Sequence, residues 1–273
     1  MKRHILLIIT TAIIGMTLNA CTINIDGEKL GGKTIKGNGN IVTRTYDVSA
    51  FNEISIALPA KVNYTVSTDY TCTVRVDENI LEYLDIKVQD QELLMGKQKD
   101  EKNTNLRATE FVIDVTAPSL ESINLAGSGK FNALSPIEGE SLRANVAGSG
   151  DIFFKEKVTV DTVEMNVAGS GDIECNELVA AKLDANVAGS GDLNVKAGKV
   201  VAAEVGVAGS GDCVLACEID SMEANVAGSG DIIAARVNDN LEYGIIGSGS
   251  ISYGGNPVVK GDKVGSGSIK HVE

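Results

Sequence analysis

The sequence predicts an all-β protein built mainly as a single-chain parallel β-helix, or β-solenoid. Three observations predict this fold. The tripeptide Gly-Ser-Gly recurs eight times, the residues on both sides of it alternate between apolar and polar, and no stretch of about ten residues combines helical apolar spacing with helix caps. The apolar fraction, 43% of 273 residues, is enough to order a core rather than leave the chain disordered.

The repeat has a period that shrinks toward the C-terminus. Its first glycines are Gly127, Gly148, Gly169, Gly189, Gly209, Gly228, Gly247 and Gly265. A unit of about 20 residues cannot bury its apolar face alone, whereas stacked units bury a continuous core. We therefore expect about eight coils of 18–21 residues over residues 121–273, with equivalent residues about 4.8 Å apart.

Each repeat unit is interpreted as a strand, a tight turn and a second strand. Before the second turn, alternation directs Leu142, Ala144 and Val146 inward, and Arg143 and Asn145 outward. The two glycines supply the positive φ that a sharp corner needs, and the serine can bond the backbone of the corner.

Residues 41–120 also alternate over short segments and are predicted to be β. We interpret this region as the irregular first coils, or cap, of the same solenoid, because an open end would template aggregation. Within it, the segment from Glu78 to Tyr83 fits one helical turn.

Residues 1–20 have the pattern of a lipoprotein signal peptide. Lys2 and Arg3 precede an apolar run that is too short for a comfortable membrane span. The run ends in Leu-Asn-Ala-Cys, which resembles a lipobox and predicts lipidation of Cys21. The glycine-rich residues 21–40 are predicted to be a flexible tether. We therefore expect an exported protein with a lipid anchor in the outer membrane, at the cell surface or on the periplasmic face.

Charge and histidine content narrow the function. The net charge of −13 disfavours nucleic acid as a partner. Of the two histidines, His4 lies in the predicted signal peptide. Only His271 then remains for acid–base catalysis by a histidine. Glycan cleavage by a carboxylate pair needs no histidine, but it needs two carboxyl groups in different environments, and here they repeat evenly. We expect a non-enzymatic protein, with a polysaccharide-degrading β-helix enzyme as an alternative.

Four cysteines follow the predicted lipidation site: Cys72, Cys175, Cys213 and Cys217. The last two lie four residues apart on one extended segment, about 13 Å, which is too far for a disulfide. Cys175 and Cys213 stand at different offsets from their glycines. Free buried thiols are therefore expected.

Stacking turns repeated positions into columns. One column is formed by Asn124, Asn145, Asn166, Asn186 and Asn225, with Gly206 and Gly244 interrupting it. A mostly acidic column runs beside it and contains Glu164, Asp184, Glu204, Glu223 and Glu242. The asparagines can bond one another along the stack as a structural ladder. Alternatively, they form with Glu164 and Glu223 a flat face that binds a glycan or a protein, although the absence of Trp disfavours a glycan.

A second polar column directly follows the corners. It contains Asp151, Asp172, Asp192, Asp212 and Asp231. These carboxylates can bond the backbone of the corner, or they can form a calcium-binding edge. We favour the first interpretation, because calcium-binding nonapeptide repeats place their Asp one residue further from the last glycine. No other cofactor is expected.

Several segments together resemble one known family. They are Val48-Ser-Ala-Phe-Asn-Glu-Ile-Ser, Asp77-Glu-Asn-Ile-Leu-Glu-Tyr-Leu, Val115-Thr-Ala-Pro-Ser-Leu-Glu-Ser-Ile and the Ala-Gly-Ser-Gly-Asp series. Across about residues 46–250 the chain is similar to the putative auto-transporter adhesin family with a head GIN domain. The resemblance implies a β-helical surface protein associated with adhesion, and it carries over no catalytic or binding residues.

The sequence as a whole predicts a non-enzymatic, lipid-anchored cell-envelope protein. We expect an adhesin that binds a surface, a glycan or a protein partner through the flat face of the β-helix. The alternative is a structural or assembly component in which that face packs against another copy as a homo-oligomer.

Overall fold

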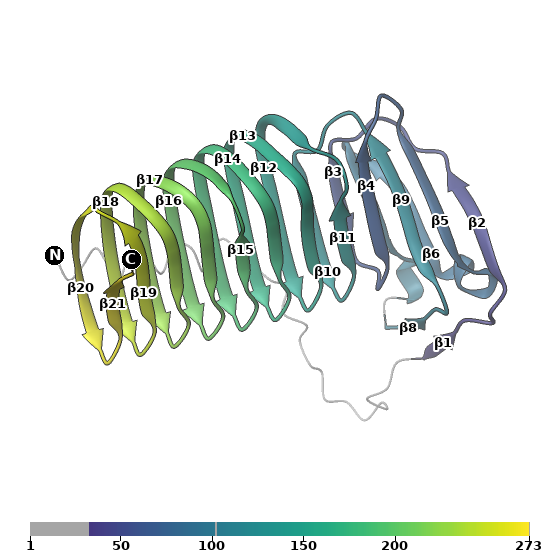
Figure 1. The fold of residues 1–273 in the computed structure, drawn as a ribbon. Coiled ribbons are helices and arrows are strands. Elements are labelled where there is room, and N and C mark those ends of the chain that lie inside the picture. The colour runs from purple at the N-terminus through teal and green to yellow at the C-terminus, as the bar shows by residue number, and fades with distance from the viewer. Residues whose placement is uncertain (1–32, 102, 273) are drawn as a thin grey trace.

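A computed structural model describes residues 33–101 and 103–272. The chain forms a straight stack of coils that is closed at its N-terminal end by a cap (Figure 1). The predicted signal peptide, the predicted lipidation site at Cys21 and the tether up to residue 32 lie outside the described residues. Within the described ranges, no helix is both long and apolar enough to cross a bilayer.

The cap consists of short strands and two 3₁₀ helices. Its strands are β1 (Thr34–Lys36), β2 (Ile41–Tyr46), β3 (Glu53–Ile56), β4 (Lys61–Val66), β5 (Thr71–Asp77), β6 (Leu84–Gln89), β7 (Glu92–Lys97), β8 (Asn105–Arg107) and β9 (Phe111–Ala117). Its 3₁₀ helices are η1 (Glu78–Tyr83) and η2 (Lys99–Glu101). The helical turn expected at Glu78–Tyr83 is therefore confirmed.

The cap changes the pairing from parallel to antiparallel. Strands β3 and β4 pair in parallel with β10 (Ser122–Gly127) and β11 (Lys130–Ala133), so they belong to the stack of coils. On their other side they pair in parallel with β7 and β9. Strand β5 pairs antiparallel with both β9 and β2. The far end is thus covered by an antiparallel layer whose outer strand, β2, exposes Thr43, Arg44 and Thr45 at its centre.

Regular structure begins earlier than the sequence suggests. Strand β1 pairs in parallel with β8, inside the segment 21–40 that was predicted to be a flexible tether. The Asp77 carboxylate also accepts the Gly39 amide at 2.7 Å. Glycine-rich composition predicted flexibility here, but backbone pairing and a buried acceptor hold residues 34–40 against the cap.

The remaining strands build the coils. They are β12 (Ile137–Gly148), β13 (Asp151–Gly169), β14 (Ile173–Gly189), β15 (Leu193–Val195), β16 (Gly198–Gly209), β17 (Cys213–Gly228), β18 (Ile232–Gly247), β19 (Ser250–Gly255), β20 (Val258–Gly265) and β21 (Ser268–His271). The first glycine of each repeat is the parallel partner of the next one, from Gly127 through to Gly265. The predicted β-solenoid of about eight coils is confirmed.

Each full coil has a third side that the strand–turn–strand interpretation missed. Between β13 and β14 the pairing runs over residues 152–154, 157–160 and 162–169 of β13, with breaks between these stretches. The middle stretch directs Val158 and Val160 into the core. Few residues of this middle stretch are identical from one repeat to the next. In the sequence it therefore looks like a loop between units rather than a strand.

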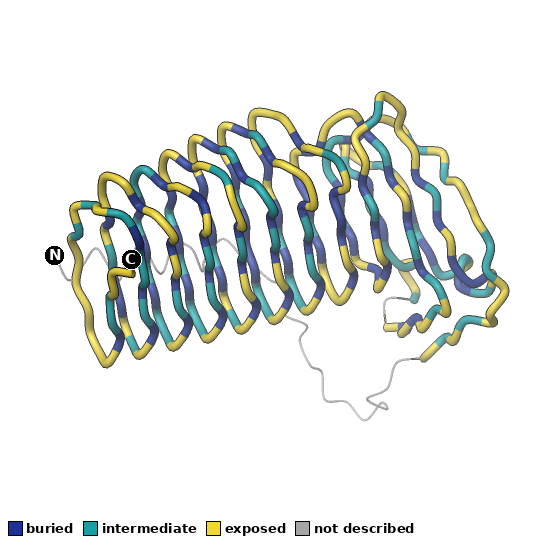
Figure 2. Tube along the Cα trace, viewed as in Figure 1, coloured by how far each residue is buried: buried dark blue, intermediate teal, exposed yellow. Residues whose placement is uncertain are grey.

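The core is one continuous apolar column. Leu142, Ala144 and Val146 are buried as predicted, and their equivalents through β17 join the core of the cap. In the last coil two of the equivalent residues, Gly261 and Lys263, are exposed. Figure 2 shows this buried band running inside the coils from the cap to the C-terminal end.

The two glycines of each corner have different roles. The first has a φ between +100° and +134° in all eight corners, as expected. The second has no positive φ, so the prediction that both glycines supply it is wrong. Its constraint is contact between coils: a Cβ added to Gly171 would lie 1.9 Å from the carbonyl oxygen of Gly150. The second glycine is therefore needed because successive corners stack backbone on backbone.

Candidate binding face

One side of the stack is a flat parallel sheet that leads into the corners. It is formed by β10, the C-terminal parts of β12, β13, β14, β16, β17 and β18, and β20. Because the register between these strands is regular, equivalent side chains form straight columns on its outer surface. We call this surface the column face and define it by its asparagine column and its acidic column.

The asparagine column is a hydrogen-bonded ladder. The amide Nδ2 of Asn145 donates to Oδ1 of Asn124 at 2.9 Å, and Asn166 donates to Asn145 at the same distance. Asn186 continues the ladder to Asn166 at 3.2 Å. The predicted structural ladder is present over these four coils and stops where Gly206 replaces asparagine.

The same amides also fix the neighbouring carboxylates. Asn166 Nδ2 donates to Glu164 at 2.7 Å, and Asn186 donates to Asp184 at 2.7 Å. Asn225 bonds Glu223 at 3.0 Å in the same way. Because both donors of a ladder amide are used internally, the asparagines mainly position the carboxylates, and the carboxylate oxygens retain lone pairs for a partner.

The acidic column gives this face its negative charge. Glu164, Asp184, Glu204, Glu223 and Glu242 occupy one register position in five successive coils. Arg143 pairs with Glu164 at one end of the column, at 3.0 Å. Along the rest of it, side chains of like charge stand about 4.8 Å apart. The column is therefore suited to a partner with cationic or hydroxyl groups.

Glu204 shows the effect of this repulsion between like charges. Partial burial raises the pKa of its carboxyl group, and the charges of Asp184 and Glu223 raise it further. Lys182, at 3.9 Å, opposes this effect. Gly206, two residues on, offers Glu204 no amide like the one that Asn186 gives Asp184. A cation placed over Glu204 would relieve the repulsion among three carboxylates.

The column of aspartates forms a separate ladder on the adjoining side. Oδ1 of Asp172 accepts the backbone N–H of Asp192 at 2.9 Å, and Asp192 accepts that of Asp212 at 2.9 Å. Asp231 accepts both the N–H and the hydroxyl of Ser250. These carboxylates bond backbone, as we favoured, but in the next coil rather than in their own corner. Among the described residues no group of three or more acidic, His or Cys side chains is arranged to hold a metal ion.

All four cysteines of the described chain are buried and free, as predicted. Burial raises the pKa of the Cys72 and Cys175 thiols to about 12. A thiol with such a pKa is almost never a thiolate at neutral pH, so these cysteines serve the core rather than chemistry.

The chain matches one known family over most of its length. The sequence profile of a family described as "Putative auto-transporter adhesin, head GIN domain" matches residues 50–214 and 145–257. Comparison with curated proteins gives no match.

Three solved structures of similar fold come from Parabacteroides. One described as a putative adhesin from Parabacteroides merdae is 28% identical, with a TM-score of 0.83 over 89% of this chain and 100% of that chain. One described as a putative lipid binding protein from Parabacteroides distasonis is 32% identical, with a TM-score of 0.81 over 88% and 100%. A further putative adhesin from Parabacteroides distasonis is 27% identical, with a TM-score of 0.80 over 88% and 100%.

Proposed function

The chain belongs to the putative auto-transporter adhesin family with a head GIN domain, and we propose that it is a non-enzymatic adhesin that binds a glycan or protein partner through the column face. In this proposal Cys21 carries a lipid anchor in the outer membrane, and the solenoid is exposed at the cell surface. The partner presents cationic or hydroxyl groups to the acidic column.

One observation carries the proposal: the carboxylates are held in place before any partner arrives. Glu164, Asp184 and Glu223 are each fixed by an asparagine two residues along the same strand. Preorganisation of this kind lowers the entropy that binding must overcome. A row of carboxylate acceptors at regular spacing also matches a partner that itself repeats.

A binding role is favoured over catalysis by the same geometry. Glu204 is the one column carboxylate with a raised pKa, and it is flanked evenly by Asp184 and Glu223, so no single acid–base pair stands apart from the row. His271, the one histidine in the described chain, lies in the last strand and bonds the Gly255 carbonyl at 2.7 Å.

Retention of protein-coated beads tests the proposal. Beads carrying the full chain are passed over immobilised mucin, a basic protein such as lysozyme, and dextran as a neutral glycan. We expect retention on mucin or lysozyme, and at least a tenfold loss of it with Glu164→Gln, Glu204→Gln and Glu223→Gln combined, because the line of acceptors loses its charge.

The matched control neutralises three exposed carboxylates outside the column face: Glu138→Gln, Glu140→Gln and Asp161→Asn. This variant should be retained like the unchanged protein. Equal loss with both triple variants, or no retention on any of the three surfaces, would contradict binding through the column face.

A further inference from the structure

Two adjoining hollows lie where the cap meets the first coil. Their volumes are about 300 Å³ and 470 Å³, they are open to solvent, and they share Pro59, Leu106 and Ser128 as lining residues. We call them together the junction groove. It is formed by the loop between β3 and β4, the strand β8 with its flanks, and the first Gly-Ser-Gly corner.

The junction groove is positively charged in an acidic protein. Lys61, Lys97, Arg107 and Lys130 line it, and no Asp or Glu of the described chain is among its lining residues. Lys97 donates to the Thr104 carbonyl at 2.7 Å. Lys130 reaches Asp151 at 2.7 Å. The net charge of the whole chain is −13, so this concentration of cations departs from the rest of the molecule.

Like charges in the groove are held in register. Lys61 of β4 is the parallel partner of Lys130 in β11. Arg107 of β8 is likewise the partner of Lys36 in β1. Like charges directly opposite each other on neighbouring strands are destabilising. The Lys61–Lys130 pair lies within the groove, and Arg107 is the only member of the second pair that lines it. A bound anion would offset the cost of these like-charge pairs to stability.

The exposed surface of the groove combines polar and apolar groups. Its larger apolar side chains, Leu58, Leu106 and Phe111, are at most 9% exposed, so they belong to the core. The side chains that face solvent are Lys61, Arg107 and Lys130, the polar Asn103, Asn105 and Ser128, and the small apolar Ala57, Pro59 and Ala126. The exposed apolar side chains are small, whereas the cations and amides offer a polar anion several donors.

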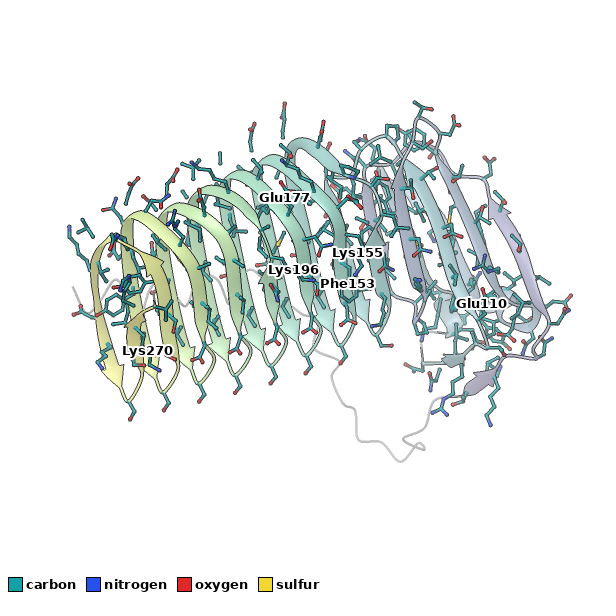
Figure 3. The ribbon with its side chains drawn as sticks, viewed as in Figure 1. Glu110, Phe153, Lys155, Glu177, Lys196 and Lys270 are labelled. Atoms are coloured by element: carbon teal, nitrogen blue, oxygen red, sulfur yellow. The ribbon has the colours of Figure 1, made fainter. Side chains whose placement is uncertain are left out.

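The positive surface continues onto the coil beside the groove. Lys130 lies 5.6 Å from the centre of the Phe153 ring, and Lys155 lies 4.1 Å from it. Figure 3 shows Phe153 and Lys155 close together on the coils, with Lys196 further along, where it pairs with Glu174 at 2.5 Å. Lys155 therefore extends the cations of the groove from Lys130 onto the next coil.

We propose that the junction groove binds an anionic polysaccharide, whose carboxylate or sulfate groups pair with Lys61, Arg107 and Lys130. This site is separate from the acidic column and has the opposite charge. The protein would thus hold two chemically different partners, an anionic glycan at the junction and a cationic or hydroxyl-rich partner on the column face.

The test measures binding of the full chain to heparin and polygalacturonate, with dextran as the neutral glycan and phosphatidylglycerol vesicles as the lipid source of anions. We expect binding to at least one acidic polysaccharide, weakening as salt rises because exposed charges are screened. Dextran should not bind. Lys61→Gln with Arg107→Gln should weaken binding at least tenfold.

The control, Lys199→Gln with Arg236→Gln, removes the same charge from exposed positions on later coils and should change affinity less than twofold. All the replaced side chains are exposed, and an unchanged melting temperature verifies that both variants fold. The proposal is overturned by absence of binding to both polysaccharides, by equal weakening in the two double variants, or by binding to vesicles alone. A negative result for the junction groove would not contradict binding through the column face, because the two tests change different residues.

Discussion

Gly171→Ala is expected to destabilise the solenoid by about 3 kcal/mol or more. A Cβ at this position would lie 1.9 Å from the carbonyl oxygen of Gly150 in the coil below. The contact is with backbone, so no side chain can rotate away to make room. The same corner bonds Ser170 N and Gly171 N to the Gly148 carbonyl, and separating the coils would weaken both bonds. Urea unfolding followed by circular dichroism measures the loss.

Two other glycines separate the causes of this effect. Gly127 has a φ of +100° but nothing within 4 Å of an added Cβ, so Gly127→Ala measures backbone strain alone, about 1 to 3 kcal/mol. Gly139 has neither constraint, and Gly139→Ala should change stability by about 1 kcal/mol or less. If Gly171→Ala were no worse than Gly139→Ala, the close stacking of corners would be refuted.

Asp77→Ala is the second substitution with a large expected effect, about 3 kcal/mol. The Asp77 side chain is completely buried in the cap. Its carboxylate accepts the backbone N–H of Gly39 at 2.7 Å and that of Thr109 at 2.6 Å. Alanine would leave both N–H groups without this acceptor and would loosen the segment that precedes β2. Thermal unfolding of the full chain measures the change.

The same carboxylate predicts a dependence of stability on pH. Burial by itself raises the pKa of Asp77, but the hydrogen bonds from Thr109 and Gly39 outweigh burial and hold the pKa below its usual value of 3.8. A group whose pKa is lower in the folded state stabilises the fold above its unfolded pKa, and that contribution disappears as pH falls through the folded pKa. Stability of the unchanged protein should therefore decline below about pH 4.

Asp77→Ala should flatten this acidic decline, because it removes one of the groups responsible. The control is Asp85→Ala, which removes an exposed carboxylate paired with Lys87 and should cost less than about 1 kcal/mol. An acidic decline as steep in Asp77→Ala as in the unchanged protein would show that another group controls it.

The coils were predictable from the sequence because their contacts repeat. The recurring Gly-Ser-Gly corner fixes the register between neighbouring coils, and the register alone places Asn145 beside Asn166. The buried alternation leading into each corner followed for the same reason. Contacts between equivalent residues of adjacent coils, such as the asparagine ladder, can therefore be predicted from the repeat alone.

The cap and the junction groove could not be derived in this way. Strand β5 pairs with β9 and β2, and these segments share no repeated motif. Residue spacing in the sequence therefore does not predict their pairing. Lys61 and Lys130 are 69 residues apart in sequence and become partners only through the pairing of β4 with β11. The role of the second glycine was also missed, since a residue pattern reports that glycine is present but not which contact requires it.

Accessibility of the full chain on intact cells tests the central claim, which is that the solenoid is presented outside the cell as an adhesin. A C-terminally tagged chain is expressed in a Gram-negative host, and intact cells are treated with protease or with an antibody against the tag. We predict digestion and labelling on intact cells, while a periplasmic control protein stays protected. Protection of the chain until the outer membrane is permeabilised would contradict the account and place the protein inside the envelope.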